Sequence, residues 1–381
     1  MFGLDARYIR ERPSGIGAYV EALVERLPLM APSVHFLLWA DRRANRPLST
    51  APNVREKTVG TGPNSPLTIL WPRWYASFDN LDLFHSPHNI LPRSISCPSV
   101  VTVHDVMALE APSLHRPGYQ RLNALYYPRA VSRALRYASR VIVPSAATAD
   151  RVAALVPEAK PRLHVIPMAP HPSFRPPEDI LAARRRAAAL IGADAPHMVV
   201  VGQNSVNKSH ETALLAFAAA APPPTRLVLL QRTGNPKALQ RLARRLGVID
   251  RVVWLSGLSR EQVVLLVQTA TALLQPSLYE GFGLPVVEAM ASGCPVIASD
   301  IPALREVTGG AALLIPPMDI AACADAVRML LASPERRRAL AEQGLAQSRA
   351  FSWDRTARDT LAVYDEVVHG PARPVARAIF A

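Results

Sequence analysis

Residues 280–288 read Glu-Gly-Phe-Gly-Leu-Pro-Val-Val-Glu and directly follow an apolar run that ends near Pro276. Proline is favoured at the first position of a helix, so Pro285 predicts a helix that begins just after the two glycines. The glycines form a loop that lets a ligand approach the backbone closely. Unpaired N–H groups and the positive dipole at such a helix start can bind phosphate without a cationic side chain. The segment therefore predicts a strand–loop–helix unit with an anion site at its turn.

The same alternation of apolar strands and amphipathic helices extends along the chain. It is typical of parallel sheets with crossover helices. Strands are expected in the first half at 34–39, 99–103 and 141–143, and in the second half at 198–201, 227–230, 252–255, 272–274 and 295–298. A chain of 381 residues with 49% hydrophobic residues can fill two α/β cores. We therefore expect an α/β protein with two Rossmann-like domains that face a cleft.

A proline-rich segment separates the two halves. Residues 167–177 read PMAPHPSFRPP, which is unsuited to a helix or a central strand and predicts a hinge linker. The expected domains are 1–172 and 173–352. In the remaining segment, 353–381, a helix is predicted over 353–368 from apolar residues at helical spacing, among them Ala357, Leu361 and Tyr364. This C-terminal helix and tail are expected to cross back onto the first domain.

Composition limits the class of protein and its partners. The net charge of +13 favours an anionic partner, but nothing resembles a nucleic-acid-binding module, so no nucleic acid is expected. Three widely spaced cysteines indicate neither a disulfide framework nor a metal site. No stretch of about 18 apolar residues could span a bilayer. A cytoplasmic protein is expected, with peripheral attachment to the inner membrane face as an option.

Lys208 is the candidate cation of the second domain. It lies in the loop 201–208, which leaves the first strand of that domain, and the carboxyl ends of strands are where open α/β sheets bind ligands. An ammonium group there would neutralise charge that grows on a leaving diphosphate. Only four of the 43 basic residues are lysines, which makes a lysine in this loop informative. The alternative is an exposed lysine at a helix start.

The first domain offers weaker signals. His104 follows the strand 99–103 and so also projects from a strand's carboxyl end, although a histidine held by a loop carbonyl is the alternative. Gly15 and Gly17 are expected between the first strand and a helix over 18–27, where glycines allow close approach to a phosphate or sugar. They lack the third glycine of the dinucleotide motif, which disfavours an NAD enzyme. His85 and His88 are expected in a loop with only a weak acceptor-site role.

These motifs together resemble the large retaining glycosyltransferase family typified by glycogen synthase and bacterial mannosyltransferases, whose architecture is called GT-B. The resemblance covers nearly the whole chain, including Gly15-Ile16-Gly17, His104-Asp105, the Lys208 loop, 280–288 and Phe351–Trp353. It implies that Glu280 binds donor-sugar hydroxyls, that Glu288 binds the ribose, and that the amides of 282–284 bind the sugar and diphosphate. The implied catalytic residues are His104, Lys208 and Glu280. The implied donor-binding residues are Gly15, Gly17, Gln203, Gly281, Phe282, Gly283, Leu284 and Glu288.

The implied activity is retaining transfer of a hexose from a nucleotide-diphosphate sugar to a hydroxyl of a glycan or lipid-linked saccharide, in bacterial surface-polysaccharide synthesis. No Asp-x-Asp occurs, so neither a metal nor a cofactor is expected. Gln203 and Asn207 stand where many relatives carry an arginine. This departure motivates an alternative, a catalytically weak GT-B subunit that binds sugar or acts as a scaffold.

An arginine stripe suggests an acceptor-side surface. The segment between Glu110 and Asp150 contains no acidic residue, and within it four arginines recur at intervals of four, three and four. This spacing aligns them along one helix face, which could bind an anionic membrane or a diphosphate lipid. The alternative is an ordinary solvated face. The four residues are Arg129, Arg133, Arg136 and Arg140.

Overall fold

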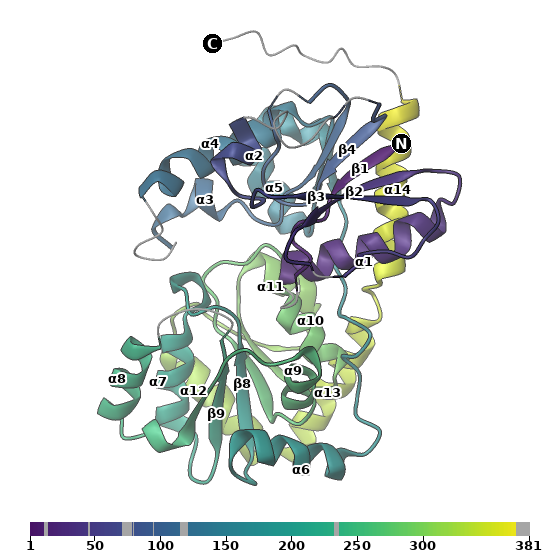
Figure 1. Cartoon of the computed structure of the whole chain (residues 1–381). Helices are drawn as coiled ribbons and strands as arrows, with labels where there is room; N and C mark the ends of the chain where they lie inside the picture. Colours follow the sequence, from purple (N-terminus) through teal and green to yellow (C-terminus); the bar gives the residue numbers. More distant parts are fainter. Residues whose placement is uncertain are drawn as a thin grey trace. The chain divides into compact units, whose positions relative to one another are not determined.

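The computed structural model describes residues 1–10, 14–44, 46–70, 78, 80–93, 95–114, 121–231 and 236–370. The chain divides into two compact units (Figure 1). Unit 1 comprises Met1–Pro112, Gly118–Met168 and Ser352–Ala381, and unit 2 comprises Ser113–Pro117 and Ala169–Phe351. The chain thus passes from unit 1 to unit 2 after Met168 and returns at Ser352, compared with the limits of 172 and 352 expected from the sequence.

Unit 1 contains a seven-stranded parallel sheet in the order β3-β2-β1-β4-β5-β6-β7. Its strands are β1 Phe2–Asp5, β2 Phe36–Asp41, β3 Val54–Val59, β4 Leu83–Ser86, β5 Ser99–Thr102, β6 Arg140–Val143 and β7 Leu163–Val165. Its helices are α1 Gly15–Met30, α2 Pro66–Leu70, α3 Met107–Glu110, α4 Arg121–Tyr137, α5 Ala146–Leu155 and α14 Trp353–His369, with 3₁₀ turns at Pro112–Leu114 and Pro157–Arg162. The central strands β4 and β5 are fully buried, as expected for a parallel sheet covered on both faces.

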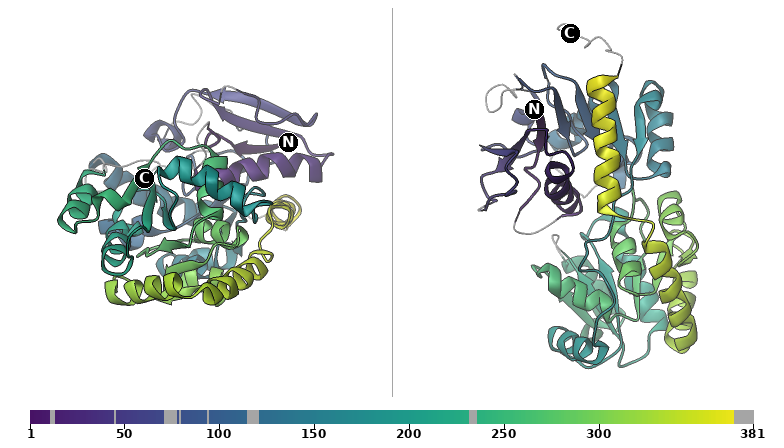
Figure 2. Two further views of the ribbon diagram at one scale, coloured as in Figure 1. Left: turned by 90° about the horizontal axis from the view of Figure 1, so that it is seen from below. Right: turned by 90° about the vertical axis from the view of Figure 1, so that its right-hand side faces the viewer.

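The C-terminal helix α14 belongs to unit 1, as the sequence predicted. It packs against α1 and β4, and Figure 2 shows it running alongside the strands of this unit. The hydroxyl of Tyr364 on α14 lies 2.6 Å from Nδ1 of the buried His85 on β4. At the start of the helix, Thr356 donates a hydrogen bond to the carbonyl of Pro167. These polar contacts fix α14 to β4 and to the segment that follows β7.

Unit 2 contains a six-stranded parallel sheet in the order β10-β9-β8-β11-β12-β13. Its strands are β8 His197–Val201, β9 Arg226–Leu230, β10 Val252–Leu255, β11 Ala272–Gln275, β12 Val296–Ser299 and β13 Leu313–Ile315. Its helices are α6 Ile180–Ile191, α7 His210–Ala220, α8 Lys237–Arg245, α9 Arg260–Gln268, α10 Leu284–Ala291, α11 Pro302–Thr308, α12 Ile320–Ala332 and α13 Pro334–Ser348, with 3₁₀ turns η4 Val206–Lys208 and η5 Ile249–Arg251.

Both sheets have the Rossmann strand order, in which the chain starts near the centre, builds one side and then crosses to the other. The crossover makes β1 and β4 neighbours in unit 1, and β8 and β11 neighbours in unit 2. In unit 2, α7, α8 and α12 pack on one face of the sheet around Phe217, Leu229 and Val327 (Figure 1). The prediction of two Rossmann-like domains is therefore confirmed, and ligand sites are expected at the carboxyl ends of the strands next to each crossover.

We expect Met318→Gly to stabilise unit 2. Met318, in the loop between β13 and α12, has a φ of 65° and a side chain that is 67% exposed. The left-handed conformation costs a residue with a Cβ about 1–2 kcal/mol, part of which is offset by the larger unfolded-state entropy of glycine. The net gain should be about 0.5–1 kcal/mol, measured as a higher urea midpoint. Met329→Gly, inside α12, is the control and should instead destabilise by about 1 kcal/mol. A lower midpoint for Met318→Gly would contradict the assigned strain.

Candidate functional site

Lys208 and Glu280 form an ion pair in unit 2. The Lys208 Nζ lies 2.7 Å and 2.8 Å from the two carboxylate oxygens of Glu280. Lys208 ends the short turn η4 that follows β8, whereas Glu280 lies in the loop after β11. The two loops meet because β8 and β11 are adjacent in the sheet. The sequence predicted both residues for the site, and the structure brings them together as a pair.

Asn207 joins the same two loops. Its carbonyl accepts a hydrogen bond from the Leu278 N–H at 2.8 Å, and its side-chain oxygen accepts one from Ser205 at 2.7 Å. Gln203, by contrast, has an exposed side chain. Neither residue supplies the positive charge of the arginine that the resemblance implies near these positions. Asn207 instead stabilises the loop that carries Lys208.

The glycine turn that precedes α10 has the predicted form. Gly283 has a φ of 105°, a left-handed conformation that favours glycine, and it caps α10. Phe282 is buried and contacts Phe351 edge to face, with ring centroids 5.6 Å apart. The helix begins at Leu284, so Pro285 is its second residue, whereas the sequence suggested that Pro285 is its first. The first N–H groups of α10 lack partners within the helix, as at any helix start.

Glu288 is the fifth residue of α10 and lies in the second turn. A helix that began at Pro285, as the sequence predicts, would place Glu288 in its first turn, but the cap at Gly283 starts the helix one residue earlier. Its side chain is only partly exposed. Burial raises the pKa of Glu288 to about 8, and the positive charge of Arg260 partly offsets this rise. A ligand that donates hydrogen bonds to the ionised carboxylate of Glu288 would stabilise that form against the effect of burial.

We expect Glu288→Gln to stabilise the protein by an amount that grows with pH. The folded-state pKa of Glu288 lies above its unfolded value of about 4.3, so the unfolded chain loses this proton first. The contribution of Glu288 to stability is therefore complete below about pH 4.3 and decreases as the pH rises to about 8. Urea unfolding at pH 5 and pH 8 tests this. Glu342→Gln, at an exposed position of α13, is the control. Equal pH dependence in both variants would contradict the buried carboxyl.

His104 follows β5 in unit 1, as predicted. Its Nε2–H donates to the carbonyl of Pro87 at 3.0 Å, and its ring packs edge to face against Tyr19, with centroids 5.1 Å apart. Burial lowers the pKa of His104 to about 4. The ring is therefore neutral at physiological pH, with Nδ1 unprotonated. The alternative interpretation of His104, a ring held by a loop carbonyl, is therefore met by the contact with Pro87. This contact leaves Nδ1 of His104 as a hydrogen-bond acceptor.

Gly15 and Gly17 lie inside α1 and not in a loop ahead of it, so the predicted helix start at Ala18 is wrong. The side chain of Ser14 accepts the Gly17 N–H at 2.8 Å, and this cap begins the helix three residues early. A Cβ on Gly17 would lie 2.8 Å from the carbonyl oxygen of Tyr8, so glycine is required there for packing. Gly15 is exposed.

His85 and His88 are both buried. His85 lies in β4, in contrast to the prediction of a loop, whereas His88 lies in the loop after this strand, as predicted. His85 belongs to β4 and bridges Tyr364 and Thr102, with Nε2 2.8 Å from the Thr102 hydroxyl. Burial lowers its pKa to about 3, so it is neutral and structural. His88 follows β4, and its Nε2 lies 4.0 Å from the Asp5 carboxylate.

The sequence interpretation missed a buried ion pair beside His88. Arg7 Nε and Nη2 lie 2.7 Å and 2.6 Å from the two oxygens of Asp5, and both side chains are fully buried. Arg7 Nη1 donates hydrogen bonds to the carbonyl of Thr61 and to the hydroxyl of Thr68. The available signal was the pair of opposite charges two residues apart at the end of the first apolar strand.

The comparisons with known proteins agree with this geometry. Residues 183–347 match the model of glycosyl transferases group 1, and residues 13–169 match that of glycosyltransferase family 4. The two halves of this chain are thus similar to two glycosyltransferase families, the second half to group 1. Each of the two matches falls mainly within one of its Rossmann-like units.

Relatives of this chain include a Mycolicibacterium hassiacum MMP alpha-(1->4)-mannosyltransferase, 33% identical over 62% of this chain and 56% of that protein. The alignment thus spans just over half of that relative. An Escherichia coli O-antigen chain mannosyltransferase B is 26% identical over 74% of each chain. The solved structure of Anabaena Alr3699/HepE in complex with UDP-glucose has a TM-score of 0.73 at 18% identity, covering 96% of this chain and 99% of that one, which shows a shared fold.

The four arginines of the predicted stripe do not lie on one helix face. Helix α4 ends at Tyr137, and Arg140 begins β6, where it pairs with Glu366 of α14 at 2.6 Å. Arg133 donates to the carbonyls of Leu91 and Pro92, and Arg136 pairs with Glu158. Arg129 is exposed. The predicted four-arginine surface is therefore corrected: Arg140 lies outside α4, and protein groups bind Arg133, Arg136 and Arg140.

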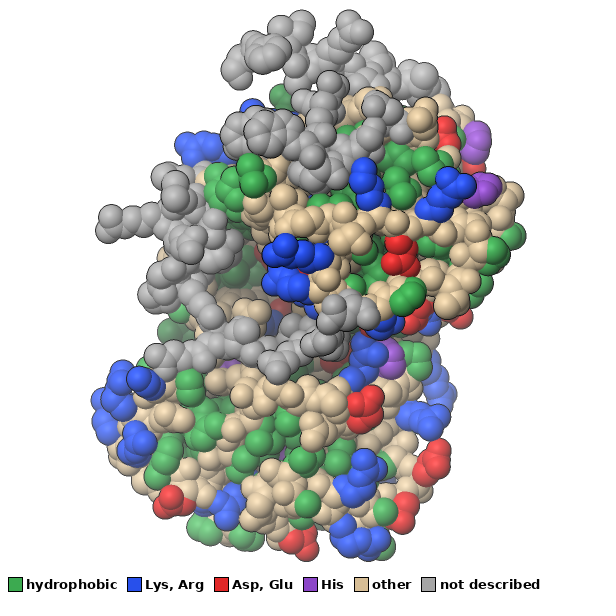
Figure 3. All heavy atoms as spheres, viewed as in Figure 1, with side chains coloured by type: hydrophobic (Ala, Val, Ile, Leu, Met, Phe, Trp, Pro, Cys, Tyr) green, Lys and Arg blue, Asp and Glu red, His purple; other side chains and the backbone are tan. Residues whose placement is uncertain are grey.

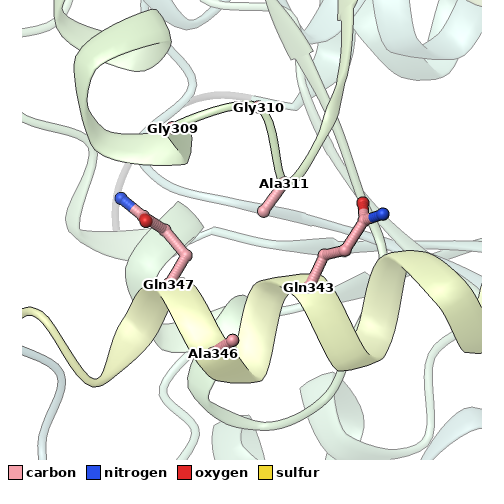
Figure 4. A pocket seen from close by; sticks show the side chains of 6 residues that line it. All are labelled: Gly309, Gly310, Ala311, Gln343, Ala346 and Gln347. Carbon is pink, nitrogen blue, oxygen red and sulfur yellow. The ribbon is translucent and has the colours of Figure 1, made fainter.

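A basic patch and a hollow are two further surface features of unit 2. On the face shown in Figure 3, basic side chains gather over α8. A hollow of about 450 Å³ lies between α13 and the turn after α11 (Figure 4), with glycine, alanine and glutamine residues around it. Among the described residues, no helix is long and apolar enough to cross a membrane, and no group of His, Cys, Asp and Glu side chains is arranged to hold a metal.

Proposed function

We propose that this chain transfers a hexose from a nucleotide-diphosphate sugar to a hydroxyl group of a glycan or lipid-linked saccharide, with retention of anomeric configuration. The Lys208–Glu280 pair carries this proposal. It places a cation after the carboxyl end of β8 and a carboxylate after that of β11, and the carboxylate lies in the loop that leads to the start of α10. Such a site offers positive charge to a diphosphate and a hydrogen-bond acceptor to sugar hydroxyls.

Lys208 would stabilise the leaving diphosphate. As the bond between the sugar and the phosphate breaks, negative charge accumulates on the phosphate oxygens, and a fixed ammonium group stabilises that charge more than it stabilises the ground state. The N–H groups at the start of α10 would share the charge. We propose that these groups make the reaction independent of a metal ion, which activity in excess EDTA would test.

Two carboxylates would position the donor. Glu280 would accept hydrogen bonds from the sugar hydroxyls, and Glu288, whose pKa is raised to about 8, would accept them from the ribose. Gly281, Phe282, Gly283 and Leu284 would contribute backbone contacts to the donor. In unit 1, the unprotonated Nδ1 of the neutral His104 can accept a hydrogen bond from a hydroxyl. The contact of His104 with the transferred sugar stays a prediction.

The names of the relatives suggest which substrates to test first. Both relatives described above are named as mannosyltransferases, and one acts on an O-antigen chain. The structural neighbour contains UDP-glucose. We therefore propose a role in bacterial surface-polysaccharide synthesis, with activated mannose and activated glucose as the first donors to examine.

A panel of nucleotide sugars that includes GDP-mannose and UDP-glucose tests the proposed function. Mass spectrometry should detect hydrolysis or transfer with wild type and a marked decrease with Glu280→Ala. The anomeric configuration of the product, read by NMR, tests retention. An inactive wild type that still binds a nucleotide sugar would favour the second candidate, a scaffolding subunit. That candidate is motivated by the exposed Gln203 and by the structural use of Asn207.

A further inference from the structure

Glu280 is held by more than Lys208. Its Oε1 accepts hydrogen bonds from Gln275 Nε2 at 2.8 Å and from Ser277 Oγ at 2.8 Å, in addition to Lys208 Nζ at 2.7 Å. Gln275 Nε2 also lies 2.9 Å from Ser277 Oγ, which links the two neutral donors to each other. Gln275, Ser277 and Glu280 are 2%, 0% and 8% exposed. Three donors thus converge on one oxygen in a site that is nearly closed to solvent.

The two neutral donors stand on a rigid support. Gln275 is the last residue of β11 and is paired in register with Ala298 of β12, and Ser277 follows two residues later. The other residues of β11, Ala272 to Leu274, are apolar and fully buried. A glutamine and a serine buried at this point are costly unless they make hydrogen bonds. Gln275 Nε2 and Ser277 Oγ bind the carboxylate of Glu280, whereas the buried Gln275 Oε1 makes no hydrogen bond within the described part of the chain.

Such an arrangement controls the rotation of a carboxylate. The terminal torsion of a glutamate is broad and only loosely restricted by its own chain. Lys208 contacts both oxygens and therefore fixes the distance of the carboxylate more than its orientation. Gln275 and Ser277 both bind Oε1, so they fix which oxygen faces the strand end and hence the plane in which the carboxylate lies.

We infer that Gln275 and Ser277 are positioning residues that set the orientation of Glu280 toward the hydroxyls of the donor sugar. This inference rests on the proposed function, in which Glu280 contacts that sugar. Gln275 and Ser277 act through Glu280, so they affect recognition and transfer of the sugar without affecting recognition of the nucleotide. A carboxylate that rotates freely binds hydroxyls of several configurations, whereas a fixed one distinguishes among them.

Ser277→Ala and Gln275→Leu test the inference. Ser299→Ala is the matched control, because Ser299 is also a fully buried serine next to the carboxyl end of a strand, and its hydroxyl makes no hydrogen bond within the described part of the chain. Calorimetry gives the affinities for UDP, GDP, UDP-glucose and GDP-mannose. Nucleotide-sugar hydrolysis gives turnover, and thermal unfolding shows whether each variant folds.

Each test variant should lower turnover about tenfold. It should also lower the affinity for the nucleotide sugar by a similar factor when that affinity is compared with the affinity for the free nucleotide diphosphate. The affinity for UDP or GDP alone should stay within about twofold of wild type, since a lost hydrogen bond to Glu280 does not reach the nucleotide. The control should change neither quantity. A purely structural role of Ser277 would instead weaken the binding of nucleotide and nucleotide sugar to the same degree, which would overturn the inference.

A double-mutant cycle separates this inference from the proposed function. In a Glu280→Ala background, Ser277→Ala should have no further effect on turnover, because the group that it positions is gone. An equal loss with and without Glu280 would overturn the positioning role. If Glu280→Ala lowers turnover but Ser277→Ala matches Ser299→Ala, only the positioning inference fails. If Glu280→Ala itself leaves turnover unchanged, the proposed function of Glu280 fails, and the inference fails with it.

Discussion

Lys208→Ala is expected to lower turnover about a hundredfold, or by about 3 kcal/mol of transition-state stabilisation, with a smaller change in donor affinity. The positive charge meets a leaving group whose negative charge is greatest in the transition state. The substitution also leaves the Glu280 carboxylate, which is only 8% exposed, without the ammonium group that contacts both of its oxygens. Steady-state kinetics with the donor found in the panel give kcat and KM separately.

Lys237→Ala is the matched control for Lys208→Ala. Lys237 is an exposed lysine at the start of α8, in the same unit as Lys208. Its substitution by alanine makes the same change in net charge. Lys237→Ala should leave both kinetic constants within about twofold of wild type, since a charge exposed to solvent is largely screened by salt. Near wild-type turnover for Lys208→Ala would remove Lys208 from the mechanism. Equal losses for both variants would indicate a general effect of charge.

Asp5→Ala is expected to lower the free energy of unfolding by about 3–5 kcal/mol. Arg7 is fully buried, and the substitution removes its bidentate partner while the guanidinium stays charged. Burial alone would raise the pKa of Asp5, but the charge and hydrogen bonds of Arg7 outweigh it and hold the pKa below its ordinary value. The pair therefore stabilises the fold above the unfolded pKa of about 3.9, and this contribution is lost as the pH falls through the folded pKa. Urea unfolding at pH 7 measures the loss.

Two controls identify the cause of that loss. Asp82→Ala removes a carboxylate that is 62% exposed and pairs with the N-terminal amine, and it should cost no more than about 1 kcal/mol. The double variant Asp5→Leu with Arg7→Met should recover most of the stability, because it leaves no buried charge without a partner. A double variant as unstable as Asp5→Ala would mean that packing, and not the unpaired charge, accounts for the effect.

Local patterns in the sequence predicted the elements of the fold well. The strand expected at 252–255 has those bounds in the structure, and the helix expected over 353–368 is one residue longer. Period and turn residues carry this information locally. The pairing of Lys208 with Glu280 was not predictable in the same way. These residues are 72 positions apart, and they meet only because a crossover makes β8 and β11 neighbours.

Several of the incorrect predictions concern helix ends, which depend on local capping contacts that the spacing of apolar residues does not reveal. The hydroxyl of Ser14 starts α1 at Gly15, and the left-handed Gly283 starts α10 at Leu284, which moves Glu288 into the second turn. Likewise, the spacing of the arginines continued past Tyr137, where α4 ends. The burial of His85 required knowledge of Tyr364, which lies 279 residues away and binds it.

The place of α14 in the chain sets the order in which the protein can finish folding during synthesis. Ribosomes make the N-terminal segment first, and domains generally fold as units when their residues have emerged. Residues 169–351 are continuous and contain the whole sheet of unit 2, so unit 2 can complete its core while synthesis continues. Unit 1 starts first but must wait for the last helix, which supplies Tyr364 to His85 and covers α1. The domain that is begun first is therefore completed last.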